Sequence, residues 1–252
     1  FTEPNRPAPG QPPVDHPHAL RADQILERLQ TSHRGLTLTE ARCRLERFGA
    51  NTLPQGRPAG LLRVFLRQFL NPLIYILLAA AAVSLLLEEW SDAAFIFGVL
   101  LINALIGTAQ EYSAERSATA LRQLVTTNTR VLRQGDAYEI DARELVPGDL
   151  VLLEPGDRVP ADLRLLDQFA LQLDESLLTG ESLAVSKRPD EVLDPATTLG
   201  DRSNMAFAGT HVTRGRARGV VTATALGTEL GQIAQSVESG PPTKPPLLQR
   251  ME

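Results

Sequence analysis

The sequence predicts a multidomain membrane protein in which an α-helical transmembrane hairpin is joined to small N-terminal helices and an all-β domain. Three observations predict this fold class. Two runs, residues 68–87 and 93–110, contain no charged residue, and each is close to the ~20 residues that a membrane-spanning helix needs. Apolar residues recur at helical spacing before residue 60, and short apolar segments separated by turn residues follow residue 128.

The composition excludes some classes of partner. With 252 residues the chain is long enough for one large domain or two modest ones. Its net charge of -5 is mild, and Lys187 and Lys244 are its only lysines. No block of basic residues forms the stripe typical of nucleic-acid binding, so we expect no nucleic-acid partner. Arg130 and Arg133 are interpreted as solvated.

Cys43, as the single cysteine, cannot form an internal disulfide, and its helical spacing indicates a packing role.

The first residues of the chain are dominated by proline and glycine and show no periodic apolar face. Such a composition predicts a flexible arm over residues 1–18. His16 and His18 lie within this arm, and we interpret them as solvated side chains rather than metal ligands.

A small helical segment is expected over residues 19–60. Thr37 and Glu40 have the T-x-x-E spacing of a capping box, in which two side chains satisfy free N–H groups of the first turn. Gly49 supplies a left-handed stop. Two short amphipathic helices bury little apolar area alone, so we expect them to dock on a larger domain. Their apolar faces contain Ile25, Leu26 and Leu29 in the first helix and Leu38, Ala41, Leu45 and Phe48 in the second.

Residues 61–127 are predicted to form the transmembrane hairpin, with a stalk that continues from its second helix. The acidic connection, residues 88–92, is too short to join two parallel spans, so the spans are antiparallel. Arginines flank the outer end of each span. The positive-inside rule therefore places both flanks in the cytoplasm and the connection on the opposite side. The alternative is a buried hairpin of a soluble protein, but the run lengths and the arginine asymmetry argue against it.

The polar content of the two spans limits what they can bind. Neither uncharged run contains a carboxylate, so the hairpin offers no calcium cage. Asn103 lies inside the second span, and an amide group in lipid is expected to face another helix. Contact with a transported ion is the other possibility, and we favour the packing role.

Residues 128–238 are predicted to form a β-domain of sandwich or jelly-roll type. Gly135-Asp136 is a strong hairpin-turn signal. The Pro-Gly-Asp segments at 147–149 and 155–157 are interpreted as structural turns in which aspartate accepts hydrogen bonds from nearby N–H groups. Gly227–Val237 has the pattern of a closing helix. The expected strands contain Val131–Arg133, Tyr138–Ile140, Leu150–Leu153, Leu163–Leu166, Leu171–Leu173, His211–Thr213 and Arg218–Ala225.

One segment, residues 173–182, reads Leu-Asp-Glu-Ser-Leu-Leu-Thr-Gly-Glu-Ser. It resembles the signature loop of the actuator domain of P-type ATPases, whose central motif is T-G-E-S. Residues 35–54 resemble the N-terminal segment of type II, calcium-pump-like members. The resemblance covers about residues 20–250 and implies a distorted jelly-roll actuator domain. Further segments similar to the family pattern occur in order at Val146–Val151, Pro155–Asp162, Ala208–Thr210, Gly219–Val221 and Gly227–Gly231.

The resemblance implies that the complete protein is a cation pump that forms an aspartyl-phosphate and later hydrolyses it. Glu181 is then the carboxylate that orients the attacking water and takes its proton. Thr179 and Gly180 shape the loop, and Ser182 completes the motif. These four residues are the candidate catalytic residues. The preceding Asp174-Glu175 pair is expected to stabilise the loop rather than react.

The sequence lacks other parts of the family's machinery. Neither a D-K-T-G-T nucleophile segment nor a G-x-x-x-x-G-K-[ST] phosphate loop occurs. We therefore expect an N-terminal portion that does not hydrolyse ATP alone, in which residues 239–252 form a linker toward a third span. ATP and Mg²⁺ would serve the complete protein, and we assign no cofactor or metal site to this chain.

The expected partners are the lipid bilayer, the phosphorylation and nucleotide-binding domains of the complete protein, and a transported cation, calcium by resemblance. The resemblance and the hairpin together imply an integral protein of the plasma membrane with a cytoplasmic actuator domain. The alternative is a non-catalytic, membrane-anchored module that binds or regulates a partner. The missing nucleophile favours this alternative, whereas the intact loop around Glu181 argues against it.

Cysteine labelling tests the predicted orientation of the hairpin. In sealed cells, a reagent that cannot cross membranes is expected to label the Ser91→Cys variant at position 91 and to leave native Cys43 unlabelled. Labelling of Cys43 after permeabilisation is the control. Because the positive-inside rule places the two residues on opposite sides, the reverse pattern would overturn the orientation.

Overall fold

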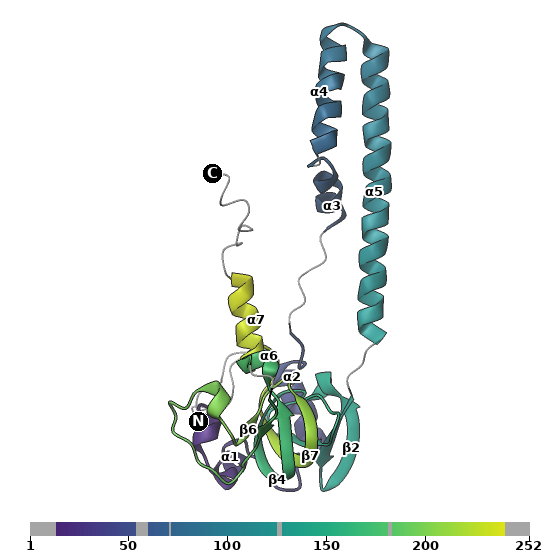
Figure 1. Cartoon of the computed structure of the whole chain (residues 1–252). Helices are drawn as coiled ribbons and strands as arrows, with labels where there is room; N and C mark the ends of the chain where they lie inside the picture. The colour runs from purple at the N-terminus through teal and green to yellow at the C-terminus, as the bar shows by residue number, and fades with distance from the viewer. Residues whose placement is uncertain (1–13, 54–59, 71, 125–127, 181–182, 240–252) are drawn as a thin grey trace, which may run out of the picture. The chain divides into compact units, whose positions relative to one another are not determined.

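The computed structural model describes residues 14–53, 60–70, 72–124, 128–180 and 183–239. The chain divides into two structural units (Figure 1). One unit covers residues 55–126, and the other combines residues 1–54 with 127–252. The expected combination of small helices, an apolar helical hairpin and an antiparallel β-domain is confirmed.

The first unit contains three helices: α3 (Leu61–Gln68), α4 (Pro72–Leu86) and α5 (Trp90–Leu124). The uncharged run expected to form one helix from residue 68 is therefore divided, because α3 ends at Gln68 and α4 begins at Pro72. Proline has no N–H group and disfavours helical backbone in the residue before it, which makes it a natural first residue of a new helix. The stretch Trp90–Ala114 of α5 is long and apolar enough to cross a membrane, whereas the apolar part of α4 is shorter.

The two long helices of this unit lie side by side and contact one another (Figure 1). Ala81 of α4 and Ala93 and Ala104 of α5 are buried, whereas most large apolar side chains of both helices are exposed. Small residues allow close approach of helices, and the exposed apolar surface is what lipid would cover. We predicted that the Asn103 amide faces another helix. Asn103 is exposed, so the amide has no such contact within the described part of this unit.

The second unit is built on a seven-stranded antiparallel sheet in the order β2-β1-β3-β7-β4-β5, with β6 paired to β4. Its long central strands, β4 and β7, carry the other strands on either side. The predicted turn at Gly135-Asp136 joins β1 to β2, and Gly135 has a φ of +93°. The strands are β1 (Asn128–Arg133), β2 (Asp136–Asp141), β3 (Leu150–Leu153), β4 (Asp162–Asp174), β5 (Val185–Ser186), β6 (Met205–Ala206) and β7 (His211–Ala223).

Strands β4 and β7 are each continuous where the sequence analysis expected two separate strands. Their pairing contains register shifts, one of them between Phe169 and Gln172. There Ala170 has a φ of +50° and faces Gly215, where a Cβ atom would overlap the Ala170 carbonyl. A β-bulge lets a strand continue while one residue leaves the ladder. The polar, glycine-containing segment of β7, which the sequence analysis left between two expected strands, is therefore an irregularity within one long antiparallel ladder.

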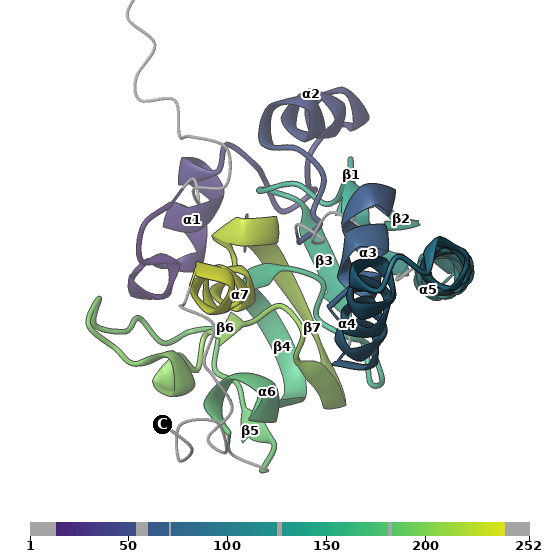
Figure 2. The ribbon, with the colours of Figure 1, turned by 90° about the horizontal axis from the view of Figure 1, so that it is seen from above.

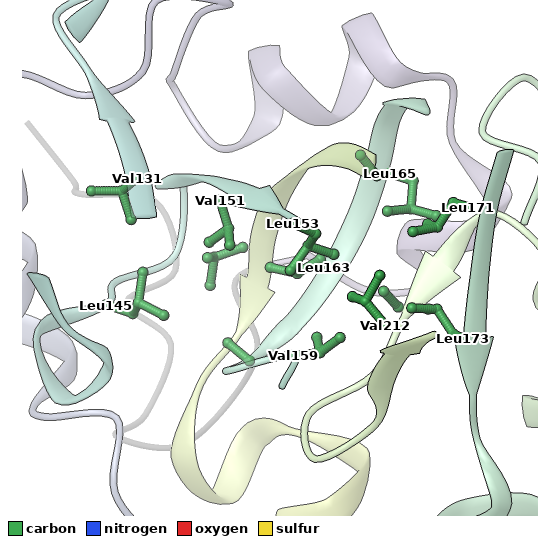
Figure 3. Close-up of a cluster of buried hydrophobic side chains, with 14 residues drawn as sticks. Val131, Leu145, Val151, Leu153, Val159, Leu163, Leu165, Leu171, Leu173 and Val212 are labelled. Carbon is green, nitrogen blue, oxygen red and sulfur yellow. The ribbon is translucent and has the colours of Figure 1, made fainter. Parts of the chain in front are cut away.

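One apolar cluster fills the interior of this unit, with side chains from β1, β3, β4 and β7 (Figure 3). Strict alternation of inward and outward side chains explains why Leu163 and Leu165 enter the cluster together. Its members are Val131, Leu145, Val151, Leu153, Val159, Ala161, Leu163, Leu165, Leu171, Leu173, Ala206, Val212, Ala217 and Val221.

The N-terminal helices α1 (Ala22–Arg28) and α2 (Leu38–Phe48) dock on this domain, as expected (Figure 2). The Thr37–Glu40 capping box is present in both directions: the Glu40 N–H donates to Thr37 Oγ1, and the Thr37 N–H donates to Glu40 Oε2. Gly49 ends α2 with φ +80° and ψ 176°, a region that only glycine reaches, rather than the left-handed helical conformation expected. Cys43 is exposed, so its predicted packing role is wrong.

The predicted flexible arm is wrong for the described residues 14–18. Val14 and His18 are buried, and the 3₁₀ helix η1 (Pro17–Ala19) packs on the β-domain. The His18 carbonyl accepts hydrogen bonds from Asn204 Nδ2 at 2.8 Å and from the Leu193 N–H at 3.1 Å. The prediction of a flexible arm rested on a proline-rich composition without a periodic apolar face. Hydrogen bonds to the backbone nevertheless hold this segment on the domain.

Asn51 joins the end of the N-terminal segment to three separate parts of the β-domain. Its Nδ2 donates to the carbonyls of Ala142 and Pro160 at 3.1 and 2.9 Å. Its Oδ1 accepts from the Ala225 N–H at 2.8 Å. Ala225, with a φ of +50°, begins the 3₁₀ helix η4 (Ala225–Gly227), which leads into the closing helix α7 (Glu229–Ser239). One amide group therefore fixes both the entry to and the exit from the β-domain.

We predict that Asn51→Ala destabilises this domain by about 2–3 kcal/mol, because three hydrogen bonds of roughly 1 kcal/mol each are lost. Urea unfolding of the chain in detergent, followed by far-UV circular dichroism, measures the free energy of unfolding. Hydrogen exchange at Ala225 gives the local effect. Thr52→Ala, at an exposed neighbouring position, is the matched control. Equal stability of the two variants would contradict the role given to Asn51.

Candidate functional site

The T-G-E-S loop leaves from the end of β4 and returns to the neighbouring strand β5 (Figure 2). Gln172 and Leu173 of β4 pair with Ser186 and Val185 of β5. A four-residue helix, α6 (Ser176–Thr179), forms the first half of the connection. Both ends of the loop are thus fixed on adjacent strands of one sheet.

Hydrogen bonds from the first loop residues determine the start of α6. Asp174 Oδ1 accepts from the Ser176 N–H at 3.0 Å, and hydrogen bonds from Ser176, first its hydroxyl and then its N–H, hold the pKa of the Asp174 carboxyl below its usual value. The Glu175 carbonyl accepts from the N–H groups of Leu178 and Thr179, and from Thr179 Oγ1 at 3.2 Å. Both acidic residues are engaged within the chain, as expected for residues that stabilise the loop.

Gly180 ends α6 in the left-handed conformation, with φ +76° and ψ 0°. Its N–H donates to the Ser176 carbonyl at 2.9 Å. A Cβ atom at this position would meet nothing within 4 Å, so the backbone conformation, and not crowding inside this chain, favours glycine. The open space leaves the backbone approachable from outside.

The structure therefore describes two of the four predicted site residues. Thr179 is half-buried at the end of α6, and Gly180 follows it on the surface. Glu181 and Ser182 lie outside the described residues. The catalytic role given to this motif stays a prediction, while the scaffold that leads into it is defined.

The sequence analysis did not identify Lys187, which directly follows β5. Its Nζ lies 2.6 Å from Glu175 Oε1, and the two side chains are 0% and 1% exposed. Burial raises the pKa of Glu175 and lowers that of Lys187, and each opposes the shift of the other through its charge. Lys187 Nζ also donates to the Arg202 carbonyl at 3.4 Å and lies 5.8 Å from the centre of the Phe207 ring. No helix or strand periodicity pairs a residue before a loop with one after it, so nothing in the sequence indicated that Glu175 and Lys187 form an ion pair.

The two Pro-Gly-Asp segments are turns, as predicted. Gly148 and Gly156 have φ values of +96° and +92°. Asp149 Oδ2 accepts from the Val146 N–H at 3.1 Å, and Asp157 Oδ2 accepts from the Glu154 N–H at 2.8 Å.

Asp149 has a second function, which the sequence analysis missed. Arg133 donates to both of its carboxylate oxygens, from Nε at 2.9 Å and from Nη2 at 2.7 Å. Arg133 is buried, so its interpretation as a solvated side chain is wrong. The bidentate geometry supplies the fully desolvated carboxylate with charge-assisted hydrogen bonds.

No metal centre can be assigned among the residues whose placement the structure describes, because no three His, Cys, Asp or Glu side chains converge there.

Comparison with known proteins identifies the family. Residues 123–238 match the P-type ATPase actuator domain, and residues 17–84 match the cation transporter/ATPase N-terminus. The chain belongs to the P-type cation-transporting ATPases. The T-G-E-S loop, with its scaffold of β4, α6 and β5, lies inside the matched actuator domain.

Several relatives in this family carry names that include a cation. The chain is 47% identical to "Probable cation-transporting ATPase F" of Mycobacterium tuberculosis and 41% identical to "Calcium-transporting ATPase" of Bacillus subtilis, in each case over 93% of the chain and 26% of the relative. It is 39% identical to "Sodium/potassium exporting P-type ATPase 2" of Saccharomyces cerevisiae, over 88% of the chain and 20% of the relative. The chain thus spans about a quarter of the length of the relatives it matches.

Substitution of Gly180 tests its conformational role. Gly180→Ala should destabilise the end of α6 by about 1–2 kcal/mol, the cost of left-handed backbone for a residue with a Cβ atom. Gly180→Asn adds a larger side chain but tolerates this conformation better, so it should cost less. Hydrogen exchange at Leu178–Gly180 compares the two variants. A greater effect of asparagine would show that space, and not backbone conformation, limits this position.

Proposed function

We propose that the chain is the N-terminal portion of an ATP-driven cation pump and that its loop promotes hydrolysis of the pump's aspartyl-phosphate intermediate. The observation that carries this proposal is the Thr179–Ser182 motif, which follows ordered secondary structure inside the matched actuator domain. The elements that support the motif are α6, the left-handed turn at Gly180 and the two flanking strands. Such preorganisation suits a loop that must meet a reacting group on another domain.

In the proposed reaction, water attacks the phosphorus atom of the aspartyl-phosphate and the bond from phosphorus to the aspartate oxygen breaks. The Glu181 carboxylate accepts a proton from the attacking water, which releases inorganic phosphate and regenerates the aspartate. Thr179 and Gly180 set the path of the backbone toward Glu181. The phosphorylation and nucleotide-binding domains of the complete protein would supply the aspartate and the sites for ATP and Mg²⁺. Magnesium would neutralise phosphate charge there.

The membrane part of the proposal rests on the helical unit. The stretch Trp90–Ala114 meets the length and composition of a spanning helix. We place α4 and α5 in the plasma membrane as a hairpin, with the actuator domain in the cytoplasm. Dephosphorylation would then be coupled to transport through the chain segments that join the two units.

Calcium is the proposed cation. It is supported by the name of the Bacillus subtilis relative, a calcium-transporting ATPase. The name of the Saccharomyces cerevisiae relative, sodium and potassium exporting, gives the competing choice. The apolar spans offer no carboxylate, so the ion ligands would come from further membrane helices.

A phosphoenzyme experiment on the complete pump tests this function. The protein is phosphorylated with labelled ATP and then chased with unlabelled ATP. In Glu181→Gln the phosphoenzyme should form normally and decay about 10²-fold or more slowly than in the wild type, because the amide cannot accept the proton. Glu46→Gln, at an exposed position of α2, is the matched control and should decay at the wild-type rate.

Each outcome of this experiment has a definite meaning. Decay of Glu181→Gln at the wild-type rate would refute the catalytic role of Glu181, and absence of any phosphoenzyme would favour the non-catalytic module. Micromolar calcium should stimulate phosphoenzyme formation. A pump that ignores calcium from micromolar to millimolar levels transports another cation.

A further inference from the structure

The Glu175–Lys187 ion pair closes the base of the T-G-E-S loop. Glu175 lies at the end of β4 directly before α6, and Lys187 lies directly after β5. The entire loop, residues 176–186, lies between them. Their charged atoms are 2.6 Å apart in an environment from which solvent is excluded. Neither oxygen of the Glu175 carboxylate has a partner with hydrogen-bond geometry in the described ranges, so the carboxylate depends on its charge contact with Lys187 Nζ.

Both members of the pair are also fixed through their backbones. The Glu175 carbonyl accepts the two hydrogen bonds from Thr179, through its N–H and its hydroxyl. The Lys187 N–H donates to the Leu171 carbonyl of β4 at 3.2 Å. A shift of Glu175 therefore moves the first residue of the T-G-E-S motif relative to the sheet. The ion pair opposes that shift by tying Glu175 to the returning strand.

Stability alone gives little reason for an ion pair in this position. The desolvation of two buried charges offsets much of their attraction, and well-packed apolar side chains of similar volume are often as stable or more stable. Apolar side chains, however, do not fix the direction of a contact. In a buried ion pair, by contrast, separation of the two partners leaves each charge uncompensated, and this cost resists movement of the two loop ends.

We propose that Glu175 and Lys187 are positioning residues for dephosphorylation, which act by holding both ends of the loop that presents Glu181. This inference rests on the function proposed above. Neither residue takes part in proton transfer. They hold the two ends of the loop in place, and a displacement of about 1 Å at a reacting group can lower a rate about 10²-fold.

The test measures formation and decay of the phosphoenzyme in the complete pump with the double variant Glu175→Gln/Lys187→Met. This variant preserves side-chain volume and leaves no unpaired buried charge, so we expect it to fold with a melting temperature close to that of the wild type. Decay should be slower by about tenfold to a hundredfold, with the rate of formation unchanged. Each single variant leaves one buried group without its partner and should slow decay at least as much.

The matched control removes an exposed ion pair of the same domain. Arg130 Nη2 and Glu154 Oε2 are also 2.6 Å apart, but their side chains are 41% and 54% exposed. Arg130→Met/Glu154→Gln should leave formation and decay of the phosphoenzyme unchanged. Wild-type decay in the Glu175→Gln/Lys187→Met variant would overturn the inference. Equal losses in formation and decay would also overturn it, because they indicate a structural defect.

Glu181→Gln, measured in parallel, separates this inference from the proposed function. If Glu181→Gln decays slowly and the double variant decays normally, only the positioning role of the ion pair is wrong. If Glu181→Gln decays at the wild-type rate, or if the wild-type protein forms no phosphoenzyme, the proposed function fails and the inference fails with it.

Discussion

The pairing of β4 with β7 is the interaction on which the rest of the β-domain depends. These two strands, Asp162–Asp174 and His211–Ala223, form the longest ladder of the sheet. Strand β3 joins β7 on one side, and β5 and β6 join β4 on the other. The connection that carries Thr179–Ser182 begins where β4 ends, and the segment that leads to α7 begins where β7 ends. Glycine at position 215 is part of this constraint, since a side chain there would collide with Ala170 across the bulge.

Among the described residues, the buried side chains of Arg133, Lys187 and Arg164 are stabilised in three different ways. Arg133 forms a bidentate pair with Asp149, and Lys187 forms a single short contact with Glu175. Arg164 contacts no carboxylate within the described residues; its guanidinium instead donates to backbone carbonyls, and burial lowers its pKa to about 10. A ring of carbonyl dipoles can solvate a guanidinium because its donors are arranged in a fixed plane. The carbonyls belong to Leu20, Leu165, Pro189, Glu191 and Asn204.

The sequence predicted features with a local cause and missed those that depend on distant parts of the chain. The Thr37–Glu40 capping box, the Gly135-Asp136 turn and the Pro-Gly-Asp turns all follow from neighbouring residues, and all are present. By contrast, the continuity of β4 and β7 depends on a bulge whose two halves are far apart in sequence. The burial of Lys187 likewise depends on a partner across the loop, and alternation along a strand cannot reveal which charged side chain has such a partner. The catalytic role of Thr179–Ser182 was assigned from resemblance and stays a prediction, because Glu181 and Ser182 lie outside the described ranges.

The two ends of β4 contact two other parts of the domain, the closing helix α7 and the short helix α6. At the start of the strand, Asp162 accepts hydrogen bonds from the Ala208 N–H and from the Glu229 N–H at the first turn of α7, each at 2.8 Å. Burial raises the pKa of Asp162 to about 7, although both N–H donors favour the ionised carboxylate. At the other end, Asp174 Oδ1 accepts a hydrogen bond from the N–H of Ser176, the first residue of α6. Aspartate side chains at the two ends of one strand therefore hold α6 and the first turn of α7 to the same sheet.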